Sequence, residues 1–347
     1  MNRQAVAAGP SLPGQILQRM QGRSTAFWVG IVVVVLVLVF NAMSGGVFTG
    51  PRSINGLLLD GAVGILLACG VTFLLAAGLL DLSVGANLVL SSVAAATTLK
   101  AVLGEGLGYD GGTGRLVAAC ALALLAAIAT GVTFGVVNGL VVTKLKVNSL
   151  IATLGTGGAA TGLALVLTDG SNITGFPSEI QRTIGTASVL DLFPVQTLAV
   201  LVIAGYLWFA MRRTRLGLYA VAIGSSTQAA RRAGIGVDGM IVKLFVQMGA
   251  LAGLAGFLGL VRFSTTSIGG SEGAALAAIA AAVIGGTSLF GGVATVGGSI
   301  VGAFLPVVLG SGLIVIGVPS FYQQIVVGVI LILAVYIDQE RRSRRLA

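Results

Sequence analysis

The chain has 347 residues, of which 56% are hydrophobic and 9% are charged, and its mean hydropathy is +1.03. Soluble globular proteins carry roughly 25% charged residues, so the composition excludes that class and indicates a membrane protein. The net charge of +9 then reflects basic cytoplasmic loops rather than nucleic acid binding. The sequence has no histidine, which excludes His-based metal sites and His general bases.

Ten apolar stretches follow one another along the chain, and a helix of about 20 such residues crosses a bilayer. Backbone groups in lipid must be satisfied within their own segment, so we expect helices, and the stretches are too long for barrel strands. The expected spans are 27–43, 55–80, 83–103, 116–142, 149–167, 195–211, 241–262, 274–290, 295–317 and 321–337. The sequence therefore predicts an all-α, polytopic membrane protein with about ten transmembrane helices.

Basic residues test this count, because Lys and Arg concentrate in cytoplasmic loops. With ten crossings that start inside, fifteen basic residues fall on the inner side and five on the outer side. The inner residues are Arg3, Arg19, Arg23, Lys144, Lys146, Arg212, Arg213, Arg215, Arg231, Arg232, Lys243, Arg341, Arg342, Arg344 and Arg345, and the outer residues are Arg52, Lys100, Arg115, Arg182 and Arg262. We therefore expect both termini in the cytoplasm, although eight crossings would pass the same test if one uncharged hairpin were lost.

Two connections between the spans are longer than the others. Residues 168–194 form an outer segment with turn formers, and residues 212–240 form a basic, helix-prone inner segment. A plain connection needs about five residues, so the length of 212–240 favours a folded cytoplasmic element that a partner contacts. The alternative is a solvated charged loop that only anchors the topology, and the residue pattern leaves both open.

Asp81 is the only charged residue within 61–99, and it lies between two expected spans in the stretch GLLDLSVGAN. An aspartate just before a helix can accept N–H bonds as a cap and favours the positive helix N-terminus, which is a structural role. The alternative is functional: Asp81, with Ser83 and Asn87, lines a translocation path or the gate beneath it.

Polar residues in other spans are further candidates for the same path, and hydrogen bonding between helices is their alternative role. They are Asn138, Thr153, Gln247, Thr287 and Ser288. The stretch AAGLLDLSVGANL also has an echo in AAVIGGTSLFGGVAT, and interrupted segments in matching halves point to a transport path. Such an echo arises easily in a sequence rich in Ala and Gly.

The sequence lacks the motifs of an enzyme. It contains no G-x-x-x-x-G-K-[ST] phosphate loop, no Ser/His or Cys/His arrangement and no zinc spacing. The stretches GTGG at 155–158 and GGT at 285–287 lie in apolar spans and are interpreted as close-packing surfaces. At most Asp60 and Asp81 are acids within the membrane, which argues against proton or sodium coupling. The remaining interpretation is a membrane transport path whose energy comes from a partner that contacts residues 212–240.

Four stretches carry a family resemblance. They are LLAAGLLDLSVGA, VVNGLVVTKLKVNSLIATLGT, RRTRLGLYAVAIGSSTQAARRAGIGV, and AAIAAAVIGGTSLFGGVATVGGSIVGAF through YQQIVVGVILILAV. The chain resembles the permease subunits of bacterial ABC importers of the ribose, xylose, arabinose and galactose type. The same superfamily includes permeases for branched-chain amino acids, nucleosides and a sugar-like quorum signal.

The resemblance implies an ABC importer permease fold in the bacterial cytoplasmic (inner) membrane, with a transmembrane permease domain at 27–338. Cytoplasmic tails would occupy 1–26 and 339–347. It also implies four kinds of partner: a second permease chain, identical or different; an ATPase subunit or tandem ATPase; a periplasmic or lipid-anchored solute-binding protein; and membrane lipids. ATP and Mg would be bound by the ATPase, so no cofactor is expected in this chain, and no nucleic acid partner is expected.

Residues 212–240 would be the coupling segment that contacts the ATPase. The residues that match the family there are Arg215, Gly217, Gly224, Ala230, Arg232 and Gly234. The resemblance implies that small residues let the ATPase approach the backbone and that arginines pair with acids on its rim. For each arginine alone, the alternative is a topology anchor.

The chain departs from the family pattern at three places. Leu79 follows Gly78 where the family has Gly-Gly, and Ser225 and Ser226 follow Gly224 where it has Gly-Gly-Asn. Alanines at 275 and 277 replace acids that the family often carries, which puts a pentose or hexose substrate in doubt.

The resulting expectation is a non-enzymatic permease subunit of an ATP-driven importer for a sugar or sugar-like solute. The same machine for nucleosides or branched-chain amino acids is the near alternative. Alternatives of other classes are an ion-coupled secondary transporter and a membrane scaffold without substrate.

Overall fold

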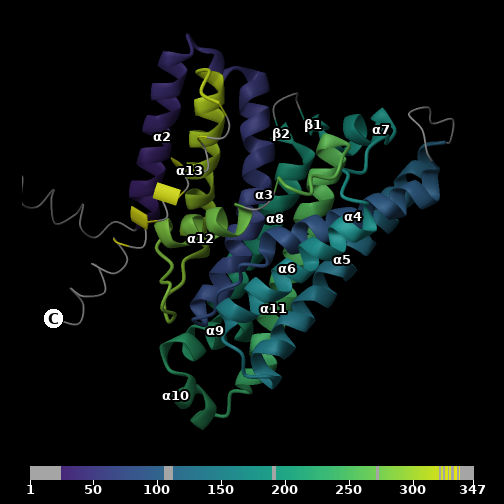
Figure 1. Ribbon diagram of the computed structural model, residues 1–347. Coiled ribbons are helices and arrows are strands. Elements are labelled where there is room, and N and C mark those ends of the chain that lie inside the picture. Colours follow the sequence, from purple (N-terminus) through teal and green to yellow (C-terminus); the bar gives the residue numbers. More distant parts are fainter. Residues whose placement is uncertain are drawn as a thin grey trace, which may run out of the picture.

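The computed structural model describes residues 25–104, 112–189, 193–270 and 273–319, together with separate residues between 322 and 336. The described chain is a helical bundle with one short hairpin (Figure 1). Its long helices are α2 (Thr25–Met43), α3 (Pro51–Ala76), α4 (Val84–Leu103), α5 (Thr113–Lys144), α6 (Ser149–Leu167), α8 (Val195–Arg213), α11 (Val237–Phe263) and α13 (Val296–Val315). The shorter elements are η1 (Val47–Thr49), α7 (Ser178–Ile180), η2 (Gln181–Gly185), α9 (Arg215–Ser225), α10 (Thr227–Arg232) and α12 (Ala274–Ile284), with β1 (Ser188–Val189) antiparallel to β2 (Phe193–Pro194).

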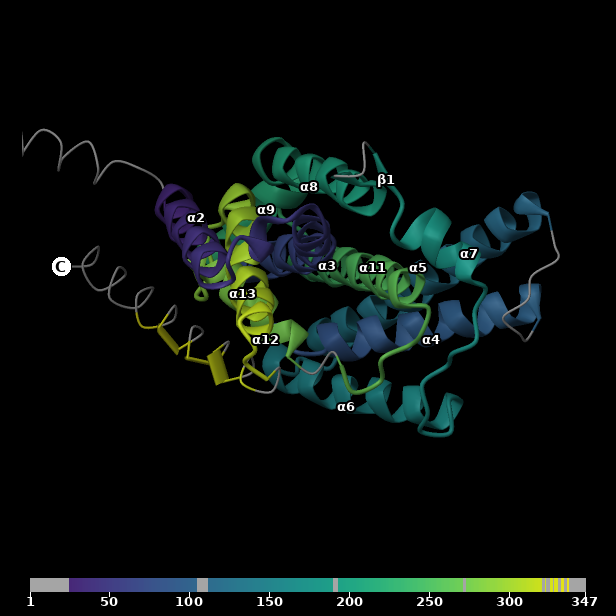
Figure 2. The ribbon, with the colours of Figure 1, turned by 90° about the horizontal axis from the view of Figure 1, so that it is seen from above.

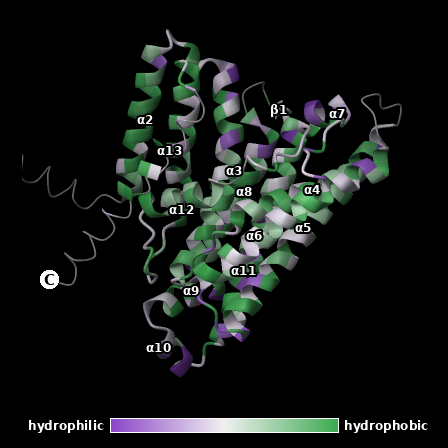
Figure 3. Cartoon of the chain, viewed as in Figure 1, coloured by the Kyte–Doolittle hydropathy of each residue, from purple (hydrophilic) through white to green (hydrophobic). Residues whose placement is uncertain are grey.

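Eight of the described helices are long and apolar enough to cross a membrane, which confirms an all-α, polytopic membrane protein. The helices α9 and α10 lie at one end of the bundle, and α7 and the hairpin lie at the opposite end (Figure 1). Hydrophilic residues gather at these ends, whereas the middle of the bundle is mostly hydrophobic (Figure 3). This distribution is the one that a lipid environment selects.

The predicted spans agree with the long helices to within a few residues, except at two places. The span expected at 274–290 is wrong in its second half, because α12 ends at Ile284 and a loop occupies 285–295. Glycines at 286, 291 and 292 adopt positive φ there, which a helix does not allow. The span expected at 321–337 and the tails at 1–26 and 339–347 lie largely or wholly outside the described residues.

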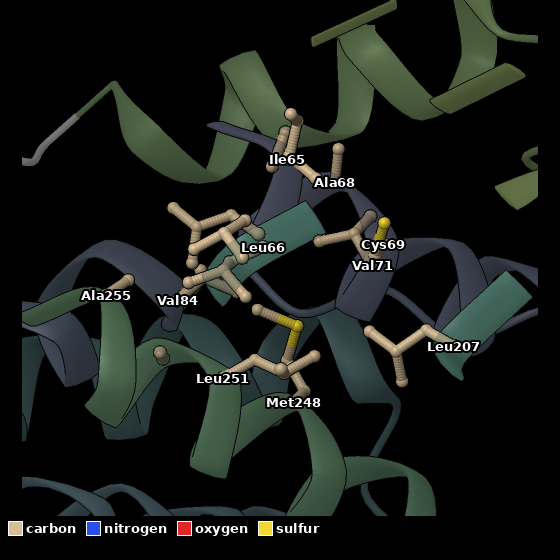
Figure 4. Close-up of a cluster of buried hydrophobic side chains, with 14 of the residues drawn as sticks. Ile65, Leu66, Ala68, Cys69, Val71, Val84, Leu207, Met248, Leu251 and Ala255 are labelled. Carbon is tan, nitrogen blue, oxygen red and sulfur yellow. The ribbon is translucent and has the colours of Figure 1, made fainter. Parts of the chain in front are cut away.

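Helix α3 forms the centre of the bundle and packs against α8, α11, α12 and α13 (Figure 2). Its residues from Ile65 to Ala76 are buried all round, as expected for a helix surrounded by other helices. Side chains of α3, α8 and α11 meet in one apolar cluster that includes Leu66, Leu207 and Met248 (Figure 4). The same cluster includes Ala77 and Val84, which flank the break between α3 and α4.

Helices α5 and α11 cross at glycines. A Cβ atom at Gly131 would overlap with the carbonyl oxygen of Gly249, and a Cβ at Gly249 would overlap with that of Gly131. Gly135 and Gly253 repeat the arrangement one turn along each helix, against Phe245 and Ala127. Small residues four apart let membrane helices approach to backbone contact.

Helices α3 and α12 end in the same way, each at a glycine with a positive φ. After α3, Gly78 has a φ of +73°, its N–H donates to the Leu75 carbonyl, and the N–H of Leu79 donates to Leu74. After α12, Gly286 has a φ of +100°, and the N–H of Thr287 donates to Ala282. This is the Schellman motif, which satisfies carbonyls at a helix end. The two stretches that echo each other in the sequence therefore both contain this kind of helix ending.

Candidate functional site

The predicted path residues Asp81, Ser83 and Asn138 lie together where α3 breaks before α4. The Asp81 carboxylate accepts hydrogen bonds from the Ser83 N–H at 2.9 Å and the Ser83 hydroxyl at 2.5 Å. The side-chain amide of Asn138 on α5 donates to the Ser83 oxygen at 2.8 Å, and its carbonyl oxygen accepts from Thr156 of α6 at 2.5 Å. All of these residues except Thr156 are buried. This hydrogen-bonded cluster therefore joins the α3–α4 break, α5 and α6 inside the bundle.

Asp81 does not cap α4 in the way expected. The residue before the helix is Ser83, and the Asp81 side chain bonds to that residue rather than to the N–H groups of the first helical turn. An aspartate that bonds two residues ahead in this way stabilises a turn. The salt bridges among the described residues do not involve Asp81.

Thr153, another predicted path residue, supports the same break from α6. Its hydroxyl accepts from the N–H of Leu82 at 3.1 Å and donates to the Ser149 carbonyl at 2.8 Å. The Ser149 hydroxyl accepts from the N–H of Leu80 at 3.2 Å. Two backbone donors of the non-helical stretch are thus satisfied by α6, as buried N–H groups require.

The remaining predicted path residues lie outside this cluster, and most of them form hydrogen bonds with other parts of the chain. Asn87 donates to the Gly131 carbonyl at 3.4 Å, and its own carbonyl oxygen accepts from Ser91. The hydroxyls of Thr287 and Ser288 accept backbone N–H groups within the loop 285–295. The amide of Gln247 is buried without a hydrogen-bond partner among the described residues, which is a costly state for a polar group.

A junction of glycines joins the loop 285–295, the end of α3 and the end of α9. The N–H of Gly292 donates to the Ala76 carbonyl at 3.0 Å. A Cβ at Gly224 of α9 would overlap with that same carbonyl oxygen, and a Cβ at Gly291 would lie 3.0 Å from the N atom of Gly78. This glycine junction (Ala76, Gly78, Gly224, Gly291 and Gly292) connects the segment 212–240 to the chain five residues before Asp81.

The segment 212–240 is folded, as the first of its two predicted alternatives requires. Ser226 caps α10 by accepting from the N–H of Ala229 at 3.2 Å, and Arg231 pairs with Asp238 at 2.5 Å on the surface. The end of α10 is closed by Gly234, whose φ is +80°. The fold of this segment thus follows from capping residues that its sequence supplies.

The six predicted coupling residues divide into two groups. Arg215, Arg232 and Gly234 are exposed, as a contact with a partner chain needs. Gly217 and Ala230 are buried, and a Cβ at Gly217 would overlap with the backbone of Met211. Together with Gly224, these small residues leave room for contacts within this chain rather than for an incoming partner.

A cavity of about 780 Å³ lies between α3, α4, α11, α12 and α13. None of the eight predicted path residues lines it. Ala277, at one of the two positions where the family often has acids, does line it, and so do Asp60 and Arg262. Six of the eight predicted residues therefore lie at the hydrogen-bonded break or in the loop 285–295, Asn87 and Gln247 lie within helices, and the cavity lies elsewhere in the bundle.

Sequence reasoning missed Ser149 and Thr156 of the hydrogen-bonded cluster, and the ion pair at the cavity. Ser149 lies four positions before Thr153 and Thr156 three positions after it, so helical spacing was the available signal. GTGG itself behaves as the predicted packing surface at one position: a Cβ at Gly157 would lie 3.3 Å from the Ser83 Cα, whereas Gly155 and Gly158 face open space.

Residues 53–335 match the family model described as the permease component of the branched-chain amino acid transport system. The chain belongs to this family. Such a permease is a transport subunit, which agrees with the prediction of a non-enzymatic chain. The resemblance to ABC importer permeases that the motifs indicated is thus confirmed.

Known permeases match nearly the whole chain. The L-arabinose ABC transporter permease protein AraH of Azospirillum brasilense is 35% identical over 322 residues, which are 92% of this permease and 89% of that protein. The ribose import permease protein RbsC of Escherichia coli K12 is 32% identical over 90% of this chain and 93% of its own. The autoinducer 2 import system permease protein LsrC of Yersinia pseudotuberculosis is 34% identical over 80% and 74%. No solved structure matches the chain significantly.

Proposed function

We propose that this chain is the membrane-spanning permease subunit of an ATP-driven importer in the bacterial cytoplasmic membrane, and that it translocates a sugar or sugar-like solute. The observation that carries the proposal is the match along about nine tenths of both chains to the arabinose and ribose permeases. A match of that extent includes the spans, the cytoplasmic segment and the loop 285–295 together.

The proposed partners are a second permease chain, an ATPase and a solute-binding protein outside the membrane. The exposed residues Arg215, Arg232 and Gly234 at the α9–α10 end of the bundle are the proposed contact with the ATPase. From there, the glycine junction offers a mechanical route to the α3–α4 break, because it joins α9 to the end of α3 by backbone contacts. Asp81, Ser83, Asn138 and Thr153 would then hold the break rather than bind solute.

The family description and the similar proteins name different solutes, so branched-chain amino acids are the second candidate. The structure adds one argument for a neutral solute. The charged side chains at the cavity are an aspartate and an arginine that already pair with each other, so each would neutralise a charged group of an amino acid less than an unpaired side chain would.

Uptake by intact cells tests the proposal. Cells with and without the gene are supplied with labelled D-ribose, L-arabinose, D-allose or L-leucine, after ATP depletion or after collapse of the membrane potential. We expect the deletion to abolish uptake of one sugar, and we expect that uptake to need ATP but not the membrane potential. Loss of leucine uptake would instead support the second candidate, and dependence on the membrane potential would support an ion-coupled carrier.

A further inference from the structure

The wall of the 780 Å³ cavity is mostly apolar, with small residues from α11 and α12 such as Gly256, Gly259 and Ala277. Ligand sites typically have volumes of roughly 300–1,000 Å³ and combine an apolar wall with a few placed polar groups. The polar part of this wall is formed by Asp60, Arg262 and nearby hydroxyls. The cavity therefore has both components of a solute site.

An ion pair is built into this wall. The Nη1 atom of Arg262, at the end of α11, lies 2.6 Å from the Oδ1 atom of Asp60 in α3. Asp60 is about 14 Å along α3 from Pro51 at 1.5 Å per residue, so the carboxylate lies within the spanning helix. Ionisable residues at such positions are costly and mark functional sites by default.

The pair keeps unused hydrogen-bonding capacity toward the cavity. The Asp60 side chain is 42% exposed and that of Arg262 is 13% exposed. Beyond the bond between them, no described residue hydrogen-bonds to the second carboxylate oxygen or to the other guanidinium N–H groups. The hydroxyl-bearing residues Ser92, Thr265 and Ser267 line the same cavity.

This chemistry fits a neutral molecule with several hydroxyl groups. A hydroxyl can donate to the free oxygen of Asp60 while another accepts from Arg262, and such charge-assisted bonds are roughly twice as strong as neutral ones. The carbon-bound hydrogens of the same molecule can pack against the alanines and glycines of the wall. A zwitterion gains less from this site, because each charge of the pair already has an opposite charge 2.6 Å away.

We propose that the Asp60–Arg262 pair is a binding site for a polyhydroxylated solute within the cavity. The inference rests on the proposed function, since it states where the solute contacts the permease. It assigns to these two residues a role beyond fastening α3 to α11, and it separates the solute contact from the hydrogen-bonded break at Asp81.

The test measures protection of a cysteine in the cavity wall, in vesicles that contain the permease with its ATPase. Ala277→Cys is introduced into a chain with Cys69→Ala and Cys120→Ala, and it is labelled with a membrane-impermeant methanethiosulfonate. Labelling is repeated with D-ribose, L-arabinose, D-allose or L-leucine. The control is Val189→Cys, which is exposed in the outer hairpin and does not line the cavity.

We expect one sugar to slow labelling of Ala277→Cys about tenfold when it is present at about ten times its Kd, because roughly one site in eleven then stays free. Leucine leaves the rate unchanged, and no solute affects the control. Asp60→Asn and Arg262→Lys abolish the protection but not the labelling itself, since lysine keeps the charge and loses the planar fork of donors. Copurification with the ATPase verifies that both variants assemble.

The inference is overturned if Ala277→Cys is not labelled, because lipid or a second chain then fills the cavity. It is also overturned if none of the three sugars protects, or if protection survives both substitutions. ATP-dependent sugar uptake without protection would leave the proposed function intact and remove this site. Protection by a sugar without ATP-dependent uptake would keep this binding site and contradict the proposed function.

Discussion

Ser83 is the residue at which the elements around the α3–α4 break meet. Its N–H and hydroxyl donate to Asp81, its oxygen accepts from Asn138, and its Cα faces Gly157 of α6. All of these contacts are made to other residues of this chain. The geometry therefore favours the structural role of Asp81 over a role in the path.

Substitution of Asp81 separates the two roles. Asp81→Asn keeps a side-chain oxygen that can accept from Ser83, so we expect assembly and uptake close to those of the wild type. Asp81→Ala leaves the buried Ser83 donors without their acceptor, so we expect a loss of about 1–3 kcal/mol in unfolding free energy. Denaturant unfolding in detergent measures the stability, and cell uptake measures function. Asp81→Asn that assembles normally but no longer transports would contradict the structural role.

At the scale of elements, the glycines between α5 and α11 set how closely these helices pack. Gly249→Ala places a methyl group against the Gly131 carbonyl, so the helices must separate, and overpacking of this kind costs about 1–3 kcal/mol. Gly205→Ala in α8 is the matched control, because a Cβ there meets nothing within 4 Å. Alanine should stabilise that helix by up to about 1 kcal/mol. Equal unfolding free energies for the two variants would contradict the close crossing.

The glycine junction makes a second prediction at this scale. Gly224→Ala forces α9 away from the Ala76 carbonyl, so we expect the ATPase to assemble and hydrolyse ATP while sugar uptake per ATP falls. Gly239→Ala, in the first turn of α11, is the control, because its Cβ would meet nothing within 4 Å. Uptake and ATP hydrolysis are measured on the same vesicles. An unchanged ratio for Gly224→Ala would show that the junction does not transmit movement.

At the scale of the whole molecule, hydropathy predicted the helices because lipid forces each span to satisfy its own backbone. It failed at α12, where the apolar composition continues to 290 but positive φ at Gly286 ends the helix. The hydrogen bonds of Asn138 were foreseen as an alternative role, since a polar side chain in a span needs a partner. Its actual partners depend on tertiary packing, which no local pattern encodes.

The sequence alone could not predict the cavity, because the cavity also depends on tertiary packing. Asp60 and Arg262 are 202 residues apart, and each alone reads as a charge near a membrane interface. Only the packing of α3 against α11 shows that they pair and face one hollow. The glycine junction is likewise formed by three segments that are distant in sequence.

The central claim is that this permease moves solute only when a partner ATPase supplies the energy. Vesicles are prepared with the purified permease alone, or with the permease, its ATPase and its solute-binding protein, and accumulation of the sugar identified in cells is measured with ATP on the cytoplasmic side. The account predicts uphill accumulation only in the complete assembly, and none by the permease alone under a membrane potential or a pH gradient. Uphill accumulation by the permease alone would contradict it.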